Sequence, residues 1–286
     1  MSTFDALLRK ADGPGTWYAP SSSSDDSDDG DDNDGLGSSS SSSDSVPMYP
    51  STTALEPEKS KSETLNYEQR PIYDAHVGRM NELVAWLAAG GVGEKPGTQQ
   101  LSLIHAGPGA GKSHLLGAIS EYSSTCGLLA IIVASLGHAA YAVGGTTAQK
   151  AMGIFAVPLV YKPPNLLTVR RMHGYPFTTN LIVEEISSFG ACLFNELDLF
   201  ARSYMGKDHL PFGGLDVTLV GDFFQLPPVK DQSLVNSAVR YALFGGADLK
   251  PREVAAAAVF LQFTMYKLEE NMRAKVRVQA CVEQLT

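Results

Sequence analysis

One short glycine-rich segment, residues 106–113, constrains the fold of this chain more than any other stretch. It reads Ala-Gly-Pro-Gly-Ala-Gly-Lys-Ser, follows an apolar run at residues 101–105 and precedes a helical pattern at residues 115–119. A strand, a glycine-rich loop and a helix in this order form the context that a phosphate-binding P-loop requires. Glycines let successive backbone N–H groups converge at the start of a helix, where a phosphate chain fits. The segment therefore predicts binding of a nucleoside triphosphate.

The side chains of this loop have separate expected roles. Lys112 would reach the β- and γ-phosphates, and the Ser113 hydroxyl would ligate Mg²⁺. The first residue of the usual pattern is glycine, and Ala106 stands there in this chain. The alternative interpretation is a glycine-rich turn that happens to precede Lys-Ser. The nucleotide-binding residues expected from the loop are Gly107, Pro108, Gly109, Ala110, Gly111, Lys112, Ser113 and His114.

The N-terminal part of the chain differs in composition from the rest. Ser and Asp dominate residues 21–45, and the eight aspartates there carry nearly all of the net charge of −9. Such a segment buries too little apolar area to offset its chain entropy. We therefore predict a disordered Ser/Asp-rich tail over residues 1–62 and one folded domain over residues 63–286. That domain is nearly neutral, which is compatible with a nucleic-acid partner because a basic groove can be local.

Apolar segments of strand character alternate with helical segments after residue 65. Strands are expected at residues 101–105, 129–134, 180–183 and 217–220, with a further strand within residues 259–268. A helix is expected to start at residue 65 and to include residues 77–87. This alternation predicts an α/β fold with a mainly parallel sheet flanked by helices.

The cysteines and the apolar runs indicate the kind of cellular compartment in which the chain is expected. Cys126, Cys192 and Cys281 lie far apart without metal-ligand spacing, so we expect buried free thiols in a reducing compartment. The apolar run at residues 128–133 is too short to cross a bilayer, which predicts no membrane association.

Two carboxylates, Glu184 and Glu185, follow the apolar residues 181–183. At the C-terminal end of a parallel strand such a pair faces the ligand crevice. In a P-loop enzyme the first carboxylate holds Mg²⁺ and the second polarises the water that attacks the γ-phosphate. The first is usually Asp, and the longer Glu184 predicts slow hydrolysis because Mg²⁺ demands strict octahedral geometry. The alternative interpretation is two surface glutamates at a strand end.

A third strand-to-loop element ends in Gly-Asp-Phe-Phe-Gln-Leu-Pro-Pro-Val at residues 221–229. If its strand lies between the P-loop strand and the strand before Glu184, its loop places Gln225 beside the γ-phosphate. A neutral amide there senses the phosphate without competing with Mg²⁺. Phe223, Phe224 and the two prolines would form a stiff apolar edge suited to transmitting that signal or to contacting bases. The alternative is an ordinary buried Phe pair followed by a rigid turn.

Five segments, in order, make the chain similar to the petite-integration-frequency (PIF) family of 5′-to-3′ DNA helicases in superfamily one. Residues 221–229 resemble that family's GDFxQLPPV motif, and residues 181–187 resemble its LIIDEIS segment. Residues 134–140, with residues 144–147, resemble its APTGxAA…GGxT motif. Residues 65–69 resemble its Q motif, and Leu268 with Arg273 resembles its L-x-x-x-x-R element.

The resemblance implies a RecA-like fold, ATP and Mg²⁺ as cofactors and single-stranded DNA as partner. It implies that Gln69 reads the adenine, that Arg273 contacts the γ-phosphate and that residues 137–140 touch DNA. Leu136 and Gln149 replace the Thr and His of the pattern, which predicts weakened DNA affinity. The expected catalytic residues are Lys112, Glu185, Gln225 and Arg273, and the expected metal ligands are Ser113 and Glu184.

The expected function is ATP-driven movement on single-stranded DNA, in repair, recombination or telomere maintenance as the family implies. The sequence ends soon after Arg273, so we expect the second RecA-like domain of such helicases to be missing and the chain alone not to separate strands. The alternatives are a non-motor ATP- or DNA-binding module and a different P-loop class, such as a clamp-loader-like ATPase. We further expect a monomer in the nucleus rather than the mitochondrion. The pair Arg170-Arg171 could meet a phosphate backbone, but a solvated helix face is preferred.

Overall fold

The structure, a computed structural model, describes residues 60–91, 95–153, 166–175, 177–272 and 274. The predicted tail, apart from residues 60–62, lies outside these residues, as do Arg273 and Cys281. In chain order the elements are η1 (Lys61–Thr64), α2 (Gln69–Ala88), β1 (Leu101–Ala106), α3 (Lys112–Thr125), β2 (Leu129–Ala134), α4 (Gly137–Ala142), β3 (Thr146–Thr147), α5 (Ala148–Ala151), α6 (Leu166–Met172), β4 (Thr178–Glu184), η2 (Ile186–Ser188), α7 (Ala191–Met205), η3 (Pro211–Gly214), β5 (Asp216–Gly221), α8 (Leu234–Phe244), α9 (Pro251–Phe260) and β6 (Thr264–Leu268).

The strands form one parallel sheet of six strands in the order β3-β2-β4-β5-β1-β6. The four strands expected at residues 101–105, 129–134, 180–183 and 217–220 are confirmed, each within a residue or two. Every residue of β5 is buried, as expected of a strand covered on both faces. Strand β5 lies between β1 and β4, which was the condition set for bringing Gln225 to the P-loop.

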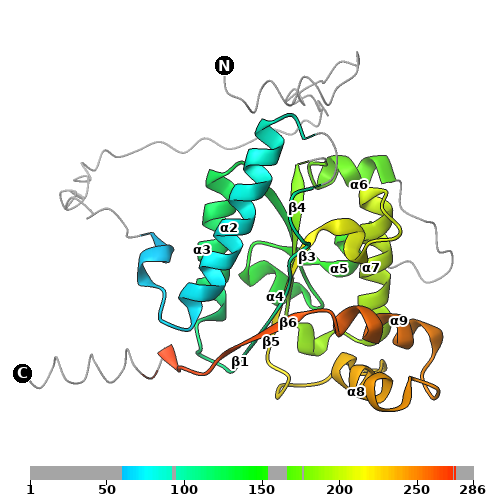
Figure 1. Cartoon of the computed structure of the whole chain (residues 1–286). Helices are drawn as coiled ribbons and strands as arrows, with labels where there is room; N and C mark the ends of the chain where they lie inside the picture. Colours follow the sequence, from blue (N-terminus) through cyan, green and yellow to red (C-terminus); the bar gives the residue numbers. More distant parts are fainter. Residues whose placement is uncertain (1–59, 92–94, 154–165, 176, 273, 275–286) are drawn as a thin grey trace, which may run out of the picture. The chain divides into compact units, whose positions relative to one another are not determined.

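Helices cover both faces of the sheet. Helices α2 and α3 pack on one face through side chains such as Ile72, Leu83 and Leu115. Helix α7 packs on the other face through Phe194 and Tyr204, together with α8 and α9. Figure 1 shows α2 and α3 on the left of the strands and α7 on the right. The α/β prediction is confirmed, and each face has its own apolar cluster.

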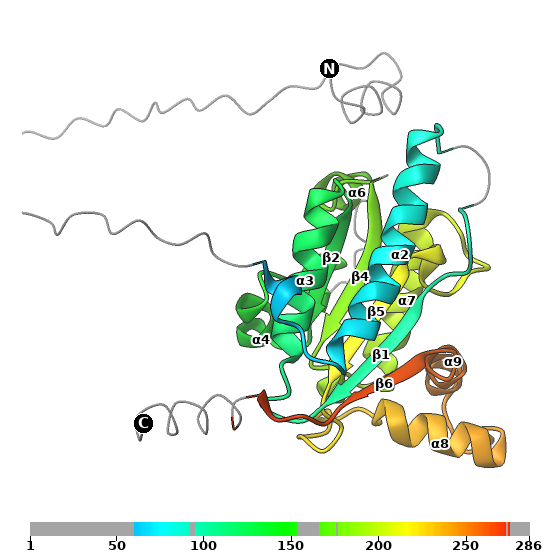
Figure 2. The ribbon, with the colours of Figure 1, turned by 60° about the vertical axis from the view of Figure 1, so that its left-hand side comes forward.

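The apolar run at residues 259–268 does not form one strand. Val259 and Phe260 end helix α9, and β6 starts only at Thr264; Figure 2 shows β6 leading away from α9. Phe260 and Phe263 pack against Phe194 at centroid distances of 6.2 and 6.3 Å, so tertiary aromatic contacts decide where the helix stops. A short apolar run is compatible with either helix or strand. The sequence pattern therefore predicted a strand within residues 259–268 but not the residue at which it begins.

Three smaller expectations are corrected. The first long helix begins at Gln69 rather than residue 65, because the Asn66 side chain accepts hydrogen bonds from the N–H groups of Glu68 and Gln69. Cys126 is free and half-buried rather than buried, and so is Cys192. The third correction concerns Arg170, which was expected on a solvated helix face but contacts other residues.

The Arg170 guanidinium has defined partners. Its Nε donates to the Tyr204 carbonyl over 2.8 Å, and the guanidinium lies 4.5 Å from the Tyr175 ring centroid. Arg171, in contrast, is exposed. The preference for a solvated helix face therefore holds for Arg171, whereas Arg170 fastens α6 to α7.

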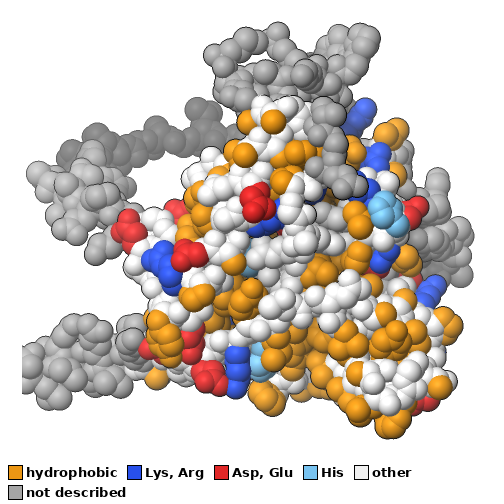
Figure 3. Space-filling model, in the orientation of Figure 1, with side chains coloured by type: hydrophobic (Ala, Val, Ile, Leu, Met, Phe, Trp, Pro, Cys, Tyr) orange, Lys and Arg blue, Asp and Glu red, His pale blue; other side chains and the backbone are white. Residues whose placement is uncertain are grey.

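Apolar side chains also gather outside the core. Figure 3 shows them over α8 and α9. Val239, Leu243 and Phe244 of α8 are all at least half exposed, and Leu261 and Met265 lie exposed further along the chain. None of the helices that the structure describes is long and apolar enough to span a membrane.

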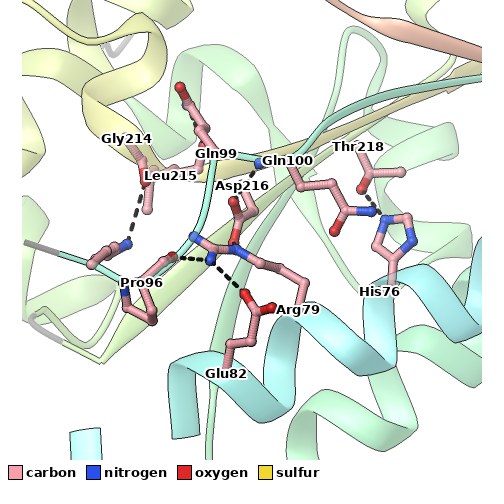
Figure 4. A network of polar contacts seen from close by, with 11 residues as sticks. His76, Arg79, Glu82, Pro96, Gln99, Gln100, Gly214, Leu215, Asp216 and Thr218 are labelled. Carbon is pink, nitrogen blue, oxygen red and sulfur yellow. Dashed lines mark hydrogen bonds and ion pairs between the residues drawn. The ribbon is translucent and has the colours of Figure 1, made fainter. Parts of the chain in front are cut away.

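A buried ion pair fastens α2 to the start of β5, at the end of the sheet opposite the P-loop (Figure 4). Arg79 Nε lies 2.9 Å from Asp216 Oδ2, and these side chains are only 8% and 5% exposed. Asp216 Oδ1 accepts a hydrogen bond from Gln100 N over 2.7 Å. One turn earlier on α2, His76 Nε2 lies 2.9 Å from Thr218 Oγ1. The network sets the position of α2 against the sheet.

We expect Asp216→Ala to lower the free energy of unfolding by about 3–5 kcal/mol, because it leaves the Arg79 charge buried without its partner. Urea unfolding followed by tryptophan fluorescence measures the change. The matched control is Glu82→Ala, which removes a second carboxylate from the same guanidinium. Glu82 is 55% exposed, so its removal is expected to cost at most about 1 kcal/mol. Equal losses in the two variants would contradict this interpretation.

Candidate active site

The loop after β1 has the backbone geometry that an anion site needs. Gly109 and Gly111 adopt left-handed conformations, with φ of 81° and 80°, and α3 begins directly after them at Lys112. The first N–H groups of a helix have no partner within the helix, so those at the start of α3 are available to a ligand. The helix dipole adds a partial positive charge at the same point.

The conformation of this loop is held from behind by the amide of Gln69. Gln69 is fully buried, and its Nε2 donates to the Gly111 carbonyl over 3.2 Å and to the Ala110 carbonyl over 3.5 Å. Its Oε1 accepts from Asn66 N over 3.0 Å. The φ of 80° favours glycine at position 111, and a Cβ there would lie 2.4 Å from Gln69 Nε2 and displace the bracing amide. The structure thus shows Gln69 bracing the loop; its predicted contact with adenine stays a prediction.

A cavity of about 660 Å³ opens in front of the loop. Its lining joins the loop to Glu185, which follows β4, and to Gln225, which follows β5. The residues that line it are Gly107, Pro108, Gly109, Gly111, Lys112, Ser113, His114, Glu185, Gln225 and Met272. Nine of these ten were predicted site residues. The carboxyl ends of parallel strands meet at one edge of the sheet, which is why residues so far apart in sequence share this wall.

Three predicted site residues that the structure describes do not line this cavity. Gln69 and Ala110 are buried behind the loop, and Glu184 is buried at the end of β4. Arg273 lies outside the described residues. Met272, which sequence reasoning missed, donates its backbone N–H to the Gly109 carbonyl over 3.0 Å and so joins the end of the described chain to the loop. A thioether carries no chemical signal that would have singled it out.

The two glutamates after β4 differ in environment. Glu184 is 5% exposed, and burial raises the pKa of its carboxyl, an effect that the Lys112 charge opposes. Its Oε2 accepts a hydrogen bond from Glu185 N over 3.2 Å. Glu185 has φ of 53° and ψ of 46°, a left-handed conformation that is uncommon for a residue with a side chain. The alternative of two surface glutamates is therefore wrong, because one is buried and the other lines the cavity.

Lys112 lies over the loop, close to Glu184. Its Nζ donates to the Ala106 carbonyl over 2.7 Å and to the Gly107 carbonyl over 3.4 Å. The ammonium group is therefore held at the mouth of the loop, where a phosphate would meet it. The Ser113 hydroxyl and the Glu184 carboxylate offer oxygen donors, the ligands that Mg²⁺ prefers, so the residues present fit that metal.

The loop after β5 is ordered by Asp222, a buried residue whose role the sequence analysis missed. Its Oδ1 accepts from Phe224 N over 3.0 Å, and its carbonyl accepts from Gln225 N over 3.0 Å. Both rings contact His105, Phe223 stacked at a centroid distance of 5.7 Å and Phe224 edge-on at 5.4 Å. The alternative of a buried Phe pair is wrong, because Phe223 is half-buried and Phe224 is 90% exposed.

A second cavity of about 710 Å³ shares a wall with the first. Glu185 and Gln225 line both cavities. The other lining residues of the second cavity are Leu136, His138, Ala139, Ser187, Ser188, Phe224, Leu226 and Pro227. It therefore joins the predicted DNA-contacting segment at residues 137–140 to the exposed edge formed by Phe224 and Leu226. The side chains of Glu185 and Gln225 thus belong to both cavities.

A parallel six-stranded sheet with a P-loop after β1 defines a P-loop domain of RecA-like architecture. The family model described as PIF1-like helicase matches residues 92–281, which is more than half of the chain. The chain belongs to the PIF1-like helicase family.

Several curated relatives match part of the chain. The ATP-dependent DNA helicase RRM3 of Saccharomyces cerevisiae is 39% identical over 131 residues, which cover 42% of this chain and 17% of that protein. The human ATP-dependent DNA helicase PIF1 is 37% identical over 129 residues, 42% of this chain and 19% of the relative. The match thus spans less than a fifth of the length of either relative.

Solved structures are similar to part of this chain at low identity. Unliganded Pif1 from a Bacteroides species is 23% identical, with a TM-score of 0.46, over 72% of this chain and 41% of that chain. Pif1 helicase from Candida albicans is 22% identical, with a TM-score of 0.45, over 72% of this chain and 40% of that chain.

Proposed function

We propose that this chain is the nucleotide-hydrolysing domain of a 5′-to-3′ DNA helicase that uses ATP and Mg²⁺ and is stimulated by single-stranded DNA. The observation that carries the proposal is the single cavity that brings together Lys112, Glu185 and Gln225. Membership of the PIF1-like helicase family supports it, as do relatives that are named ATP-dependent DNA helicases.

Each side chain of the cavity has a role in this proposal. Lys112 and the N–H groups at the start of α3 bind the phosphates, and the Glu185 carboxylate orients the attacking water and accepts its proton. Gln225 reports whether a γ-phosphate is present. Ser113 and Glu184 would hold Mg²⁺, which neutralises the charge that develops on the β- and γ-phosphate oxygens. Arg273 contributes a second positive charge to the same phosphate.

The second cavity is the proposed path for single-stranded DNA. Phe224 offers an exposed ring on which a base stacks, and its exposed neighbour Leu226 extends the apolar edge. Among the described residues of the lining, His138 is the one basic side chain, and Leu136 stands where the family pattern has threonine. Because few positive charges face the DNA phosphates, we expect this cavity to bind single-stranded DNA weakly. The same observation favours a second candidate function, a nucleotide-binding module that is not a motor.

Further parts of the proposal concern the protein as a whole. We propose a monomeric RecA-like domain that follows an acidic Ser/Asp-rich tail, and residence in the nucleus. The boundary predicted at residue 62 is corrected, because Lys61 and Ser62 belong to η1 and the Ser62 carbonyl accepts a hydrogen bond from Arg70. Roles in repair, recombination or telomere maintenance are proposed from the family resemblance.

The test of this function is phosphate release by the purified chain with ATP and Mg²⁺, with and without oligodeoxythymidine. We expect slow hydrolysis that the oligonucleotide accelerates. Nucleotide binding without hydrolysis under both conditions would instead support the non-motor module. Failure to bind any nucleoside triphosphate would contradict both candidate functions.

We expect Phe224→Ala to weaken binding of fluorescein-labelled oligodeoxythymidine by about 5-fold or more, because stacking of one base on an aromatic ring contributes about 1–3 kcal/mol. Fluorescence anisotropy measures the dissociation constant. The matched control is Phe244→Ala on α8, which removes another largely exposed phenylalanine, one that does not line the second cavity. Equal affinities for wild type and Phe224→Ala would contradict the proposed path.

A further inference from the structure

A chain of two hydroxyl groups joins the segment at residues 135–140 to the backbone of Glu185. Ser188 Oγ donates to the Glu185 carbonyl over 2.6 Å. Ser188 Oγ also makes a short hydrogen bond with Ser135 Oγ. A hydroxyl has one proton, and the Ser188 proton is used on the carbonyl. Ser135 must therefore be the donor to Ser188, which gives the chain of hydrogen bonds one direction, from Ser135 to Glu185.

The residue at the end of this chain is held in a strained conformation. Glu185 has φ of 53°, and left-handed backbone at a non-glycine residue persists only where surrounding contacts impose it. Its carbonyl accepts two hydrogen bonds from Ser188, one from the backbone N–H over 3.0 Å and one from the hydroxyl. Its N–H donates to Glu184 Oε2. The Ser188 side chain therefore helps to fix the orientation of the Glu185 carbonyl group.

The two serines are connected to the second cavity and to the residue that both cavities share. Ser188 and Leu136, the neighbour of Ser135, line the second cavity, and Glu185 lines both. The family pattern APTGxAA has proline where this chain has Ser135, and proline carries no hydroxyl. The link from residue 135 to Ser188 is thus a property of this chain's own residues rather than of the family motif.

We propose that Ser188 is a positioning residue that couples single-stranded nucleic acid in the second cavity to the orientation of the Glu185 carboxylate. The inference rests on the proposed function and adds its regulation. A strand that contacts residues 136–139 moves the Ser135 hydroxyl, and the Ser188 hydroxyl transmits the movement to the Glu185 carbonyl. Because the Glu185 backbone is strained, a small change in that contact shifts the carboxylate relative to the attacking water.

The experiment measures kcat and KM for ATP, with and without saturating oligodeoxythymidine, in Ser188→Ala, Ser135→Ala and the double variant. Since a net hydrogen bond typically changes an equilibrium by about 3- to 10-fold, we expect each single variant to lose about that factor of the DNA stimulation of kcat. The double variant should lose no more than either single variant, because both act through one chain of contacts. The KM for ATP should stay unchanged, and Ser188→Thr should restore stimulation by restoring the hydroxyl.

The matched control is Ser124→Ala on α3, which removes another serine hydroxyl bonded to a backbone carbonyl, that of Ser120, away from both cavities. Stimulation equal to wild type in Ser188→Ala overturns the inference. So does an equal loss of basal and stimulated turnover, which marks a purely structural role. A wild-type chain that hydrolyses ATP without stimulation by DNA overturns the inference and leaves the ATPase standing. A wild-type chain that neither binds nor hydrolyses ATP overturns the proposed function as well.

Discussion

Replacing Lys112 with alanine is expected to abolish measurable ATP binding. The Lys112 ammonium group lies at the mouth of the loop, held by the Ala106 and Gly107 carbonyls. Lys112 is the one lysine among the described residues that line the cavity. Removing one partner of a hydrogen-bonded charge pair costs about 2–5 kcal/mol, which corresponds to about 30-fold or more in affinity. Titration with a fluorescent ATP analogue in the presence of Mg²⁺ measures the dissociation constant.

The control for this variant is Lys150→Ala, which removes an exposed lysine on α5 that lines neither described cavity. Its nucleotide affinity should equal that of wild type. Circular dichroism shows whether both variants stay folded. Undiminished ATP affinity in Lys112→Ala would show that the loop is not the phosphate site, and the proposed function would fall with it.

The second large effect is expected at Glu185. Glu185→Gln keeps the size and shape of the side chain but removes the base, so ATP hydrolysis should fall by about 10²- to 10⁴-fold. Nucleotide affinity should change little, because the phosphates are bound by Lys112 and the start of α3. Single-turnover phosphate release measures the chemical step, and the fluorescent-nucleotide titration measures binding. A loss of hydrolysis without a loss of binding separates this variant from Lys112→Ala.

Two comparisons make the assignment of Glu185 specific. Glu121→Gln changes an exposed glutamate on α3 and should hydrolyse ATP as wild type does. Glu184→Gln changes the buried neighbour, whose proposed role is at the metal, so its effect should diminish as Mg²⁺ is raised. If Glu184→Gln abolished hydrolysis at every Mg²⁺ concentration and Glu185→Gln did not, the roles of the two carboxylates would be the reverse of those proposed.

Much of the site was predictable because its signals are local. The glycines at 109 and 111 report a backbone conformation that few other residues adopt, and the structure shows both with positive φ. The four apolar runs are bounded by turns, so their strands could be placed within a residue or two. The position of Gln225 was predicted only under a condition on strand order, which the sheet satisfies.

Other features depend on contacts between distant segments and left no local pattern. The bracing role of Gln69 becomes visible only when its amide is seen against the Gly111 carbonyl. The division of residues 259–268 into helix and strand follows from aromatic packing on Phe194. The exposure of Phe224 beside a half-buried Phe223 follows from the hydrogen bonds of Asp222.

The amino-acid sequence by itself determined that this chain has a P-loop, a parallel α/β fold and a pair of glutamates after a buried strand. Those properties follow from residue type and spacing, since glycine conformation and apolar periodicity act over a few residues. Only the tertiary structure decided that Glu184 is buried while Glu185 lines two cavities, and that Ser188 joins Glu185 to Ser135. The physical reason is that burial and hydrogen-bond partners are set by which strands lie side by side, and strand order is not encoded in any single segment.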